Sequence, residues 1–96
     1  MRIRFAPRAF ADLGDIHSYL FERNPKAARE LVAFVEKLAR GLGDFPELGQ
    51  RSDELDVRVI LLGRYPYRVY YRAEADEIVI LHIRHTARNA PEAGDV

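Results

Sequence analysis

The sequence contains no cysteine and only two serines in 96 residues. Without cysteine the chain can form neither disulfides nor thiolate metal sites, and this composition fits a reducing cytoplasm. Ser18 and Ser52 lie in no nucleophile motif, and the sequence has no glycine-rich phosphate or dinucleotide pattern. These absences argue against classical hydrolase chemistry. Acid–base catalysis on RNA stays open, because arginine, histidine and tyrosine can perform it without a metal.

Metal-binding patterns are also scarce, since the chain has only three histidines. His82 and His85 are three positions apart on an expected strand, so their side chains point to opposite faces. They cannot chelate one metal ion without distortion, and His17 lies on an expected helix. We therefore expect no metal ion and no cofactor.

Long hydrophobic runs are missing as well. No apolar segment approaches the roughly 20 residues that a membrane helix needs, and the N-terminal MRIRFAPRAF lacks the apolar part of a signal peptide. We expect a cytoplasmic protein with no membrane partner. The length predicts one domain over residues 1–89, followed by a loose tail over 90–96. A domain this small buries only about 60–65% of its unfolded surface, so a partner or a second copy would help to stabilise it.

The net charge is zero, whereas a general nucleic-acid binder is usually strongly basic. The basic residues are nonetheless uneven in type and place: thirteen of fifteen are arginine. Four arginines and no acid lie between Val57 and Ala73. The planar guanidinium group suits phosphate and carboxylate partners. A binding function must therefore depend on this local pattern.

The first half of the chain predicts a short strand and two helices. Arg2–Phe5 alternates polar and apolar residues, as a half-buried strand does. A helix over 8–23 follows, and a second over 25–40 begins at the Asn24-Pro25 boundary and ends at Gly41 or Gly43. The expected buried residues of the first helix are Phe10, Leu13, Ile16 and Leu20, with His17 as a further candidate. Those of the second are Ala28, Leu31, Val32, Val35, Leu38, Ala39 and Leu42.

Gly14 lies within the first helix and weakens it by about 1 kcal/mol relative to alanine. Close approach of another helix is the favoured explanation, and a functional bend is the alternative.

The second half predicts a turn-rich segment and three strands. Segment 44–56 is polar, with Phe45, Leu48 and Leu55 as expected anchors into the core. A strand over 57–62 precedes a hairpin of strands 67–73 and 78–85 around the connector 74–77. The resulting fold class is α+β in the order β-αα-βββ. A helical hairpin packs on one face of a small, largely antiparallel sheet.

Alternation along the strands predicts the two faces of this sheet. If the hairpin turns at Ala75, residues pair so that their numbers sum to 150. The expected core face is Tyr67, Val69, Tyr71, Val79, Leu81 and Ile83. The opposite face carries Ile78 and Ile80 together with a set of polar and aromatic side chains, which we call the interaction face. That interaction face is Arg58, Arg68, Tyr70, Arg72, His82 and Arg84.

The arginine and tyrosine side chains of this face leave three interpretations open. They can stack bases and bind phosphates, or they can dock an acidic and apolar peptide. They can also form a solvated face that nearby acids such as Asp53, Glu54 and Asp56 neutralise. His85 has the opposite parity, so we expect it to face the helices in a structural role.

The order and spacing of several motifs resemble the RelE/ParE toxin superfamily, from about Ile3 to Asn89. The motifs are Ala11-Asp12-Leu13 with Ile16, Pro25-Lys26-Ala27-Ala28, Phe45-Pro46 with Gly49, Arg58-Val59, the run from Tyr67 to Arg72, the strand from Glu77 to Ile83, and His85-Thr86-Ala87-Arg88. The resemblance implies the toxin half of a bacterial type II toxin–antitoxin pair. A small antitoxin, of the ribbon-helix-helix type, would neutralise it in a hetero-oligomer and alone would bind operator DNA.

Within that superfamily ParE-like members poison DNA gyrase, and RelE-like members cut mRNA in the ribosome. The zero net charge, the acidic Ser52–Asp56 segment and a tail without tyrosine or histidine after Arg88 favour gyrase. The first alternative is a RelE-like nuclease. Its reduced site would be Arg58, Arg64, Arg84 and His85. The second alternative is a degenerate toxin that serves only as an antitoxin partner or corepressor.

Overall fold

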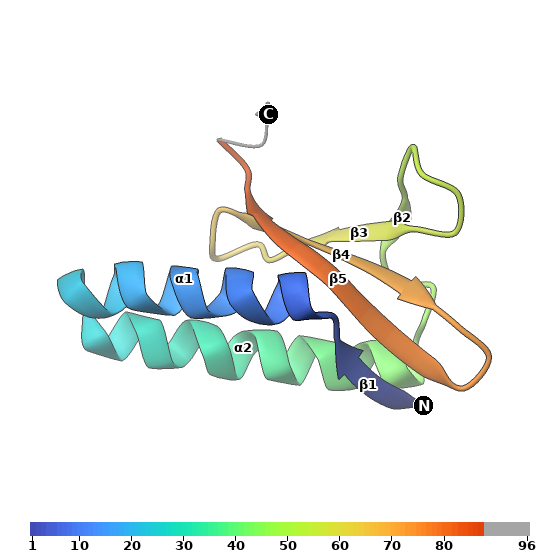
Figure 1. The fold of residues 1–96 in the computed structure, drawn as a ribbon, viewed down its shortest axis with the longest axis horizontal. Helices are drawn as coiled ribbons and strands as arrows, with labels where there is room; N and C mark the ends of the chain where they lie inside the picture. The colour runs from blue at the N-terminus through green and yellow to red at the C-terminus, as the bar shows by residue number, and fades with distance from the viewer. Residues whose placement is uncertain (88–96) are drawn as a thin grey trace.

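Two antiparallel helices lie on one face of a five-stranded sheet in the computed structural model, which describes residues 1–87 (Figure 1). The elements are β1 (Arg2–Phe5), α1 (Pro7–Arg23), α2 (Pro25–Asp44), β2 (Gln50–Arg51), β3 (Arg58–Leu61), β4 (Tyr67–Ala73) and β5 (Glu77–His85). The α+β class and the order β-αα-βββ are confirmed, with the short strand β2 as an addition. The tail predicted over 90–96 lies outside the described residues.

The strand order is β1-β5-β4-β3-β2. The long hairpin of β4 and β5 forms the middle of the sheet, and β1 pairs with β5 in the parallel direction. The other pairs are antiparallel, so the prediction of a largely antiparallel sheet is confirmed. The helical hairpin covers β5 and β4, whereas β2 and β3 extend beyond it (Figure 1).

Asn24 separates the helices, and its side chain accepts a hydrogen bond of 3.2 Å from the backbone N–H of Ala27. This cap and Pro25 at the first helical position start α2 where the sequence predicted. The predicted end of α2 is wrong, because the helix continues through Gly41 and Gly43 to Asp44. A Cβ on Gly43 would lie 3.1 Å from the carbonyl oxygen of Met1, so glycine here lets the last turn approach β1.

Two expectations for α1 are also wrong. Phe10 is 72% exposed, and the neighbouring Ala9 is the buried residue. The explanation of Gly14 by another helix fails, since a Cβ there would meet nothing within 4 Å.

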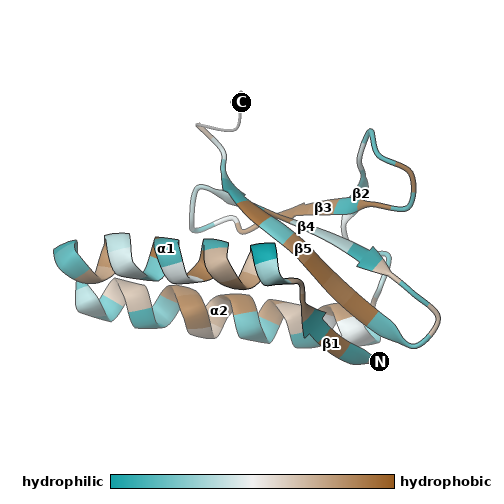
Figure 2. Cartoon of the chain, viewed as in Figure 1, coloured by the Kyte–Doolittle hydropathy of each residue, from teal (hydrophilic) through white to brown (hydrophobic). Residues whose placement is uncertain are grey.

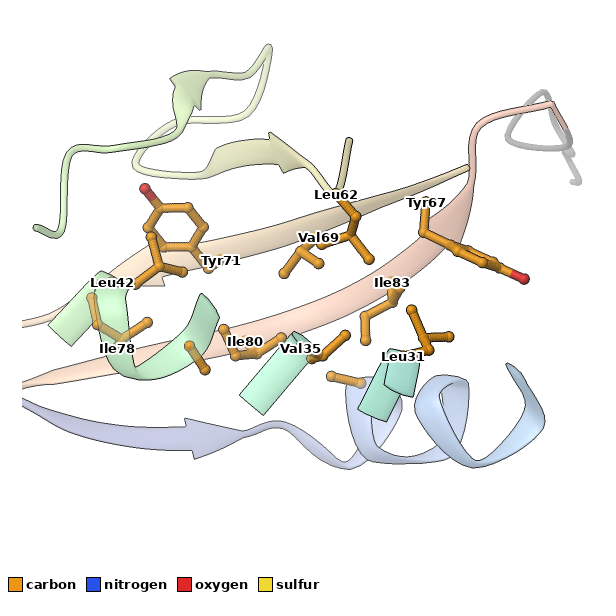
Figure 3. Packing of buried hydrophobic residues seen from close by; sticks show 12 residues of the cluster. Leu31, Val35, Leu42, Leu62, Tyr67, Val69, Tyr71, Ile78, Ile80 and Ile83 are labelled. Carbon is orange, nitrogen blue, oxygen red and sulfur yellow. The ribbon is translucent and has the colours of Figure 1, made fainter. Parts of the chain in front are cut away.

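The core lies between the helices and the hairpin (Figure 3). The hydrophobic colour in Figure 2 is concentrated along β5 and alternates with hydrophilic residues along both helices, as one buried face requires. The buried cluster comprises Ala9, Leu31, Val35, Ala39, Leu42, Leu62, Tyr67, Val69, Tyr71, Ile78, Ile80 and Ile83. The apolar stripe predicted for α2 is therefore confirmed.

The register predicted for the hairpin is wrong. The numbers of paired residues sum to 151 over Tyr71–Ala73 and to 152 over Tyr67–Tyr70, not to 150, and a β-bulge separates the two stretches. Tyr70 pairs with His82, but Tyr71 pairs with Ile80, so Leu81 is an extra residue on β5. The bulge reverses the facing of β5 beyond it. Ile78 and Ile80 join the core with Tyr71, whereas Val79 pairs with Arg72 on the other face. The core assignment of Leu81 is therefore wrong, and so is the placement of Ile78 and Ile80 on the opposite face. Val79 is buried as predicted, although it pairs with Arg72.

The side chain of Tyr71 holds the segment between α2 and β2 from the core side of the sheet. The Tyr71 hydroxyl donates to the carbonyl oxygen of Pro46 and accepts from the N–H of Gly49, both at 2.8 Å. The anchors predicted from this region are wrong: Phe45, Leu48 and Leu55 are 68%, 57% and 88% exposed. A hydroxyl in the core, and not these apolar side chains, fixes the segment.

Candidate functional site

The open face of the sheet contains a pocket of about 440 Å³. We call it the arginine pocket. Its lining residues are Ser52, Asp53, Glu54, Val59, Arg68, Tyr70, His82 and Arg84. β4 contributes Arg68 and Tyr70, β5 contributes His82 and Arg84, and the segment after β2 forms an acidic rim. Four of the six residues expected on the interaction face thus lie in one pocket.

His82 is held on two sides. Its ring stacks on Tyr70, with the ring centroids 4.3 Å apart and the planes inclined by 20°. The Arg84 Nε donates to His82 Nδ1 at 3.1 Å, so this nitrogen is an acceptor and the ring is neutral. Burial is the main cause that lowers the pKa of His82, and the charges of Arg84 and Arg8 lower it further. The histidine therefore stays uncharged beside two arginines.

Arg68 and Arg84 are directly opposite each other in the β4–β5 ladder. Like charges in this position repel each other, and an anion between them would relieve the repulsion. The Nη1 atom of Arg68 is also buried without a hydrogen-bond partner in the described part of the chain. Asp53 and Glu54 at the rim form no ion pair within residues 1–87. The pocket therefore suits a carboxylate or phosphate group from another molecule.

Arg72 and Arg58 lie outside this pocket. Arg72 pairs with Glu74 at 3.0 Å near the end of the hairpin. The expected position of Arg58 beside Tyr70 is wrong, since Arg58 pairs with Tyr71 and its side chain turns to the 47–49 segment. Its Nη1 donates to the carbonyl oxygen of Gly49 at 2.7 Å. Arg58 thus helps Tyr71 to fix that segment.

The residues suggested for a nuclease do not form one site. Arg58, Arg84 and His85 line three different pockets. Arg64 lies in the turn after β3 and is exposed, with its guanidinium 5.7 Å from the ring centroid of Tyr65. Adjacent residues on a strand face opposite ways, so Arg84 and His85 cannot act on one substrate atom.

His85 faces α1, as its parity predicted. It lines a pocket of about 270 Å³ with Asp12, Asp15, Ile16, Tyr19, Tyr67 and Ile83. Its ring meets Tyr67 edge-on at 5.2 Å, and its Nδ1 accepts from the N–H of Ala87 at 3.0 Å. These contacts support a structural role for His85.

Asp12 is a polar residue that the sequence did not assign to any contact. Its Oδ2 accepts from the backbone N–H of Ile83 at 2.9 Å, beyond the point where β1 stops pairing with β5. The available signal was an acid on a helix face that also carries Ile16 and Ala9.

Within residues 1–87 no three histidine or acidic side chains are placed to hold a metal ion. No helix in the described part is long and apolar enough to cross a membrane.

A family model described as "ParE toxin of type II toxin-antitoxin system, parDE" matches residues 3–90. The chain belongs to this toxin family. It is the toxin of a type II toxin–antitoxin system, and an antitoxin is its partner. The resemblance to the RelE/ParE superfamily is confirmed.

Two curated relatives of the toxin are themselves named as toxins. It is 31% identical over 85 residues to "Toxin RelE3" of Caulobacter vibrioides, which covers 88% of the toxin and 92% of that protein. It is 30% identical over 91 residues to "Putative toxin Y4kP" of Sinorhizobium fredii, over 95% and 94% of the two chains. These names do not distinguish a gyrase target from a ribosomal one.

Solved structures show the same fold. A chain of the "Chromosomal ParDE TA system from P. aeruginosa" matches with a TM-score of 0.78 and 26% identity, over 88% of the toxin and 95% of that chain. The YoeB dimer of Staphylococcus aureus matches with a TM-score of 0.61 and 20% identity over the same shares. The second likeness concerns the fold alone.

Proposed function

We propose that the toxin inhibits DNA gyrase in the cytoplasm until a ribbon-helix-helix antitoxin neutralises it. The observation that carries this proposal is the separation of Arg58, Arg84 and His85 into three pockets. A nuclease needs its acid, base and charge-stabilising groups within reach of one phosphate. Inhibition of an enzyme by binding does not need such a cluster.

The acidic rim of the arginine pocket supports the same proposal. Asp53 and Glu54 lie in the pocket with Arg68 and Arg84, so an approaching RNA backbone meets negative charge first. A protein segment with one well-placed carboxylate can reach the arginines without aligning a row of phosphates on that rim. We therefore assign the pocket to an acidic side chain of the antitoxin, and DNA contact in the complex to the antitoxin alone.

Purified gyrase tests the target. The toxin, separated from its antitoxin and refolded, is expected to block supercoiling of relaxed plasmid, and added antitoxin is expected to restore it. A toxin denatured by heat is the matched control. Unchanged supercoiling at a large excess of folded toxin would contradict the proposal.

A RelE-like nuclease is the second candidate, because Tyr70, His82 and Arg84 do lie together. In a translation extract this activity would cut mRNA at defined codon positions, and Tyr70→Phe and His82→Asn would reduce it. Intact mRNA together with inhibited gyrase separates the two candidates. A protein that leaves both targets unaffected and is harmless without its partner would instead be the degenerate toxin.

A further inference from the structure

A second surface lies at the end of the molecule away from the helix termini at Asn24. Phe45, Leu48 and Leu55 are all more than half exposed there, although each is a large apolar side chain. The loop between β2 and β3 shows a hydrophobic stretch between hydrophilic ones (Figure 2). Exposed apolar side chains that gather in one place mark a binding site more often than a solvated surface.

Two adjoining hollows connect these side chains. One, of about 440 Å³, is lined by Asp44, Phe45, Pro46, Glu47 and Leu48. The other, of about 420 Å³, runs from Pro46 and Glu47 to the loop that carries Leu55. The two hollows adjoin at Pro46 and Glu47, which line both. Together we call them the acidic–apolar surface.

The charge of this surface is strongly one-sided. Its acids are Asp44, Glu47, Asp53, Glu54 and Asp56. None of them forms an ion pair with a side chain of residues 1–87. The arginines present are Arg51 and Arg58, and Arg58 is occupied with the carbonyl oxygens of Glu47 and Gly49. A partner here must bring positive charge.

The surface is also fixed in shape before any partner arrives. Tyr71 and Arg58 hold the 46–49 segment through its backbone. Ser52 Oγ accepts from the N–H of Glu54 at 3.1 Å and donates to the carbonyl oxygen of Val57 at 2.9 Å. A preformed surface loses little conformational entropy on binding.

We propose that the acidic–apolar surface is a second docking site, for a basic amphipathic segment of another protein. Phe45, Leu48 and Leu55 receive the apolar side of this segment, and lysines or arginines on its edges pair with Glu47, Asp53 and Glu54. This site differs from the arginine pocket, whose ligand is an anion. The two sites adjoin each other, because Ser52, Asp53 and Glu54 line both.

A fluorescent peptide of lysine and leucine at helical spacing, titrated with the full-length toxin, tests the proposal. We expect saturable binding that weakens by about tenfold, or about 1.4 kcal/mol, in Phe45→Ser/Leu48→Ser and in Glu47→Gln/Asp53→Asn. Phe10→Ser/Phe21→Ser and Asp15→Asn/Glu22→Gln are the matched controls, because they remove as many exposed large apolar or acidic side chains from α1. Both controls are expected to bind as the unaltered toxin does.

Thermal unfolding of each variant checks that the fold is intact, which the exposure of these side chains favours. Three outcomes of the peptide titration would overturn the proposal. The first is no binding of the peptide, and the second is equal binding of a glutamate–leucine peptide. The third is equal weakening by the surface variants and by the α1 controls, which would show general attraction instead of a site. Self-association that is lost in the surface variants would assign the surface to a second copy and would also overturn it.

Discussion

Tyr71 connects the core to the segment that leads into the edge strands. Its ring is fully buried, and its hydroxyl bonds both Pro46 and Gly49. Tyr71→Phe keeps the ring but leaves the buried N–H of Gly49 without a partner. We expect the free energy of unfolding in urea to fall by about 1–3 kcal/mol. Tyr70→Phe is the control, since that ring lies on the open face, and equal losses in the two variants would contradict the assignment.

Gly14 and Gly49 are expected to respond to alanine in opposite directions. A Cβ at Gly14 meets open space on a helix, so Gly14→Ala should raise the free energy of unfolding by about 1 kcal/mol. A Cβ at Gly49 would lie 2.8 Å from the Tyr71 ring and 2.9 Å from the Val59 carbonyl oxygen, so Gly49→Ala should be destabilising. Urea unfolding of both variants measures the signs. If Gly14→Ala is destabilising, this expectation is contradicted, and another element must pack closely against Gly14.

His82 links stability to pH. Its pKa is lowered in the folded toxin, by burial first and then by Arg84, so the unfolded chain binds a proton more readily. The stability that this group contributes is therefore complete above its unfolded pKa of about 6.5 and is lost as the pH falls through the folded pKa. We expect His82→Asn to lose less stability than the unaltered toxin between neutral and mildly acidic pH, as urea unfolding would show. If the free energy of unfolding changes equally with pH in the two proteins, the pKa of His82 is the same in the folded and unfolded states.

The side chain of Asp12 hydrogen-bonds α1 to β5, in addition to the apolar packing between them. Its bond to the Ile83 N–H closes the strand edge that β1 leaves open. Asp12→Ala should lower the free energy of unfolding by about 1–3 kcal/mol, because a partly buried donor loses its acceptor. Asp12→Asn keeps an acceptor oxygen and should lose less. Asp15→Ala, an exposed acid one turn along, should have little effect, and hydrogen exchange at Ile83 should increase only in the Asp12 variants.

The elements were predictable to the extent that local patterns determine them. The positions of the strands, the Asn24-Pro25 boundary and the apolar stripe of α2 each depend on neighbouring residues, and each is confirmed. The end of α2 was not predictable. Gly43 lies inside the helix because a side chain there would be too close to the backbone of Met1, and this contact is distant in the sequence. The bulge at Leu81 was equally hidden, because only the pairing with β4 defines it.

The arginine pocket was predictable on one side of that bulge. Arg68, Tyr70, His82 and Arg84 precede the bulge along β4 or follow it along β5, so plain alternation placed them correctly. The position of Arg58 depended on how β3 aligns with β4, and the intervening turn did not reveal this. The exposure of Phe45, Leu48 and Leu55 was hidden for a related reason: the hydroxyl of Tyr71, far along the chain, replaces them as the anchor.

The whole molecule carries two adjoining sites of opposite charge preference, although its net charge is zero. The arginine pocket attracts anions, and the acidic–apolar surface attracts cations. A domain this small also gains much of its stability from what binds it. The antitoxin should therefore act on folding as well as on activity.

Thermal unfolding with and without the cognate antitoxin measures this effect. At about 100 times its Kd, antitoxin should add about 2.7 kcal/mol and raise the midpoint by roughly 10–20 °C. Arg68→Ala/Arg84→Ala should weaken binding by at least about tenfold, since charge-assisted hydrogen bonds are lost. The midpoint shift at the same concentration should then be smaller. Arg29→Ala/Arg40→Ala on exposed positions of α2 removes the same charge and should keep the full shift. If the two double variants show the same midpoint shift, the antitoxin responds to the overall charge of the toxin. The unpartnered Nη1 of Arg68 then does not bind a carboxylate of the antitoxin.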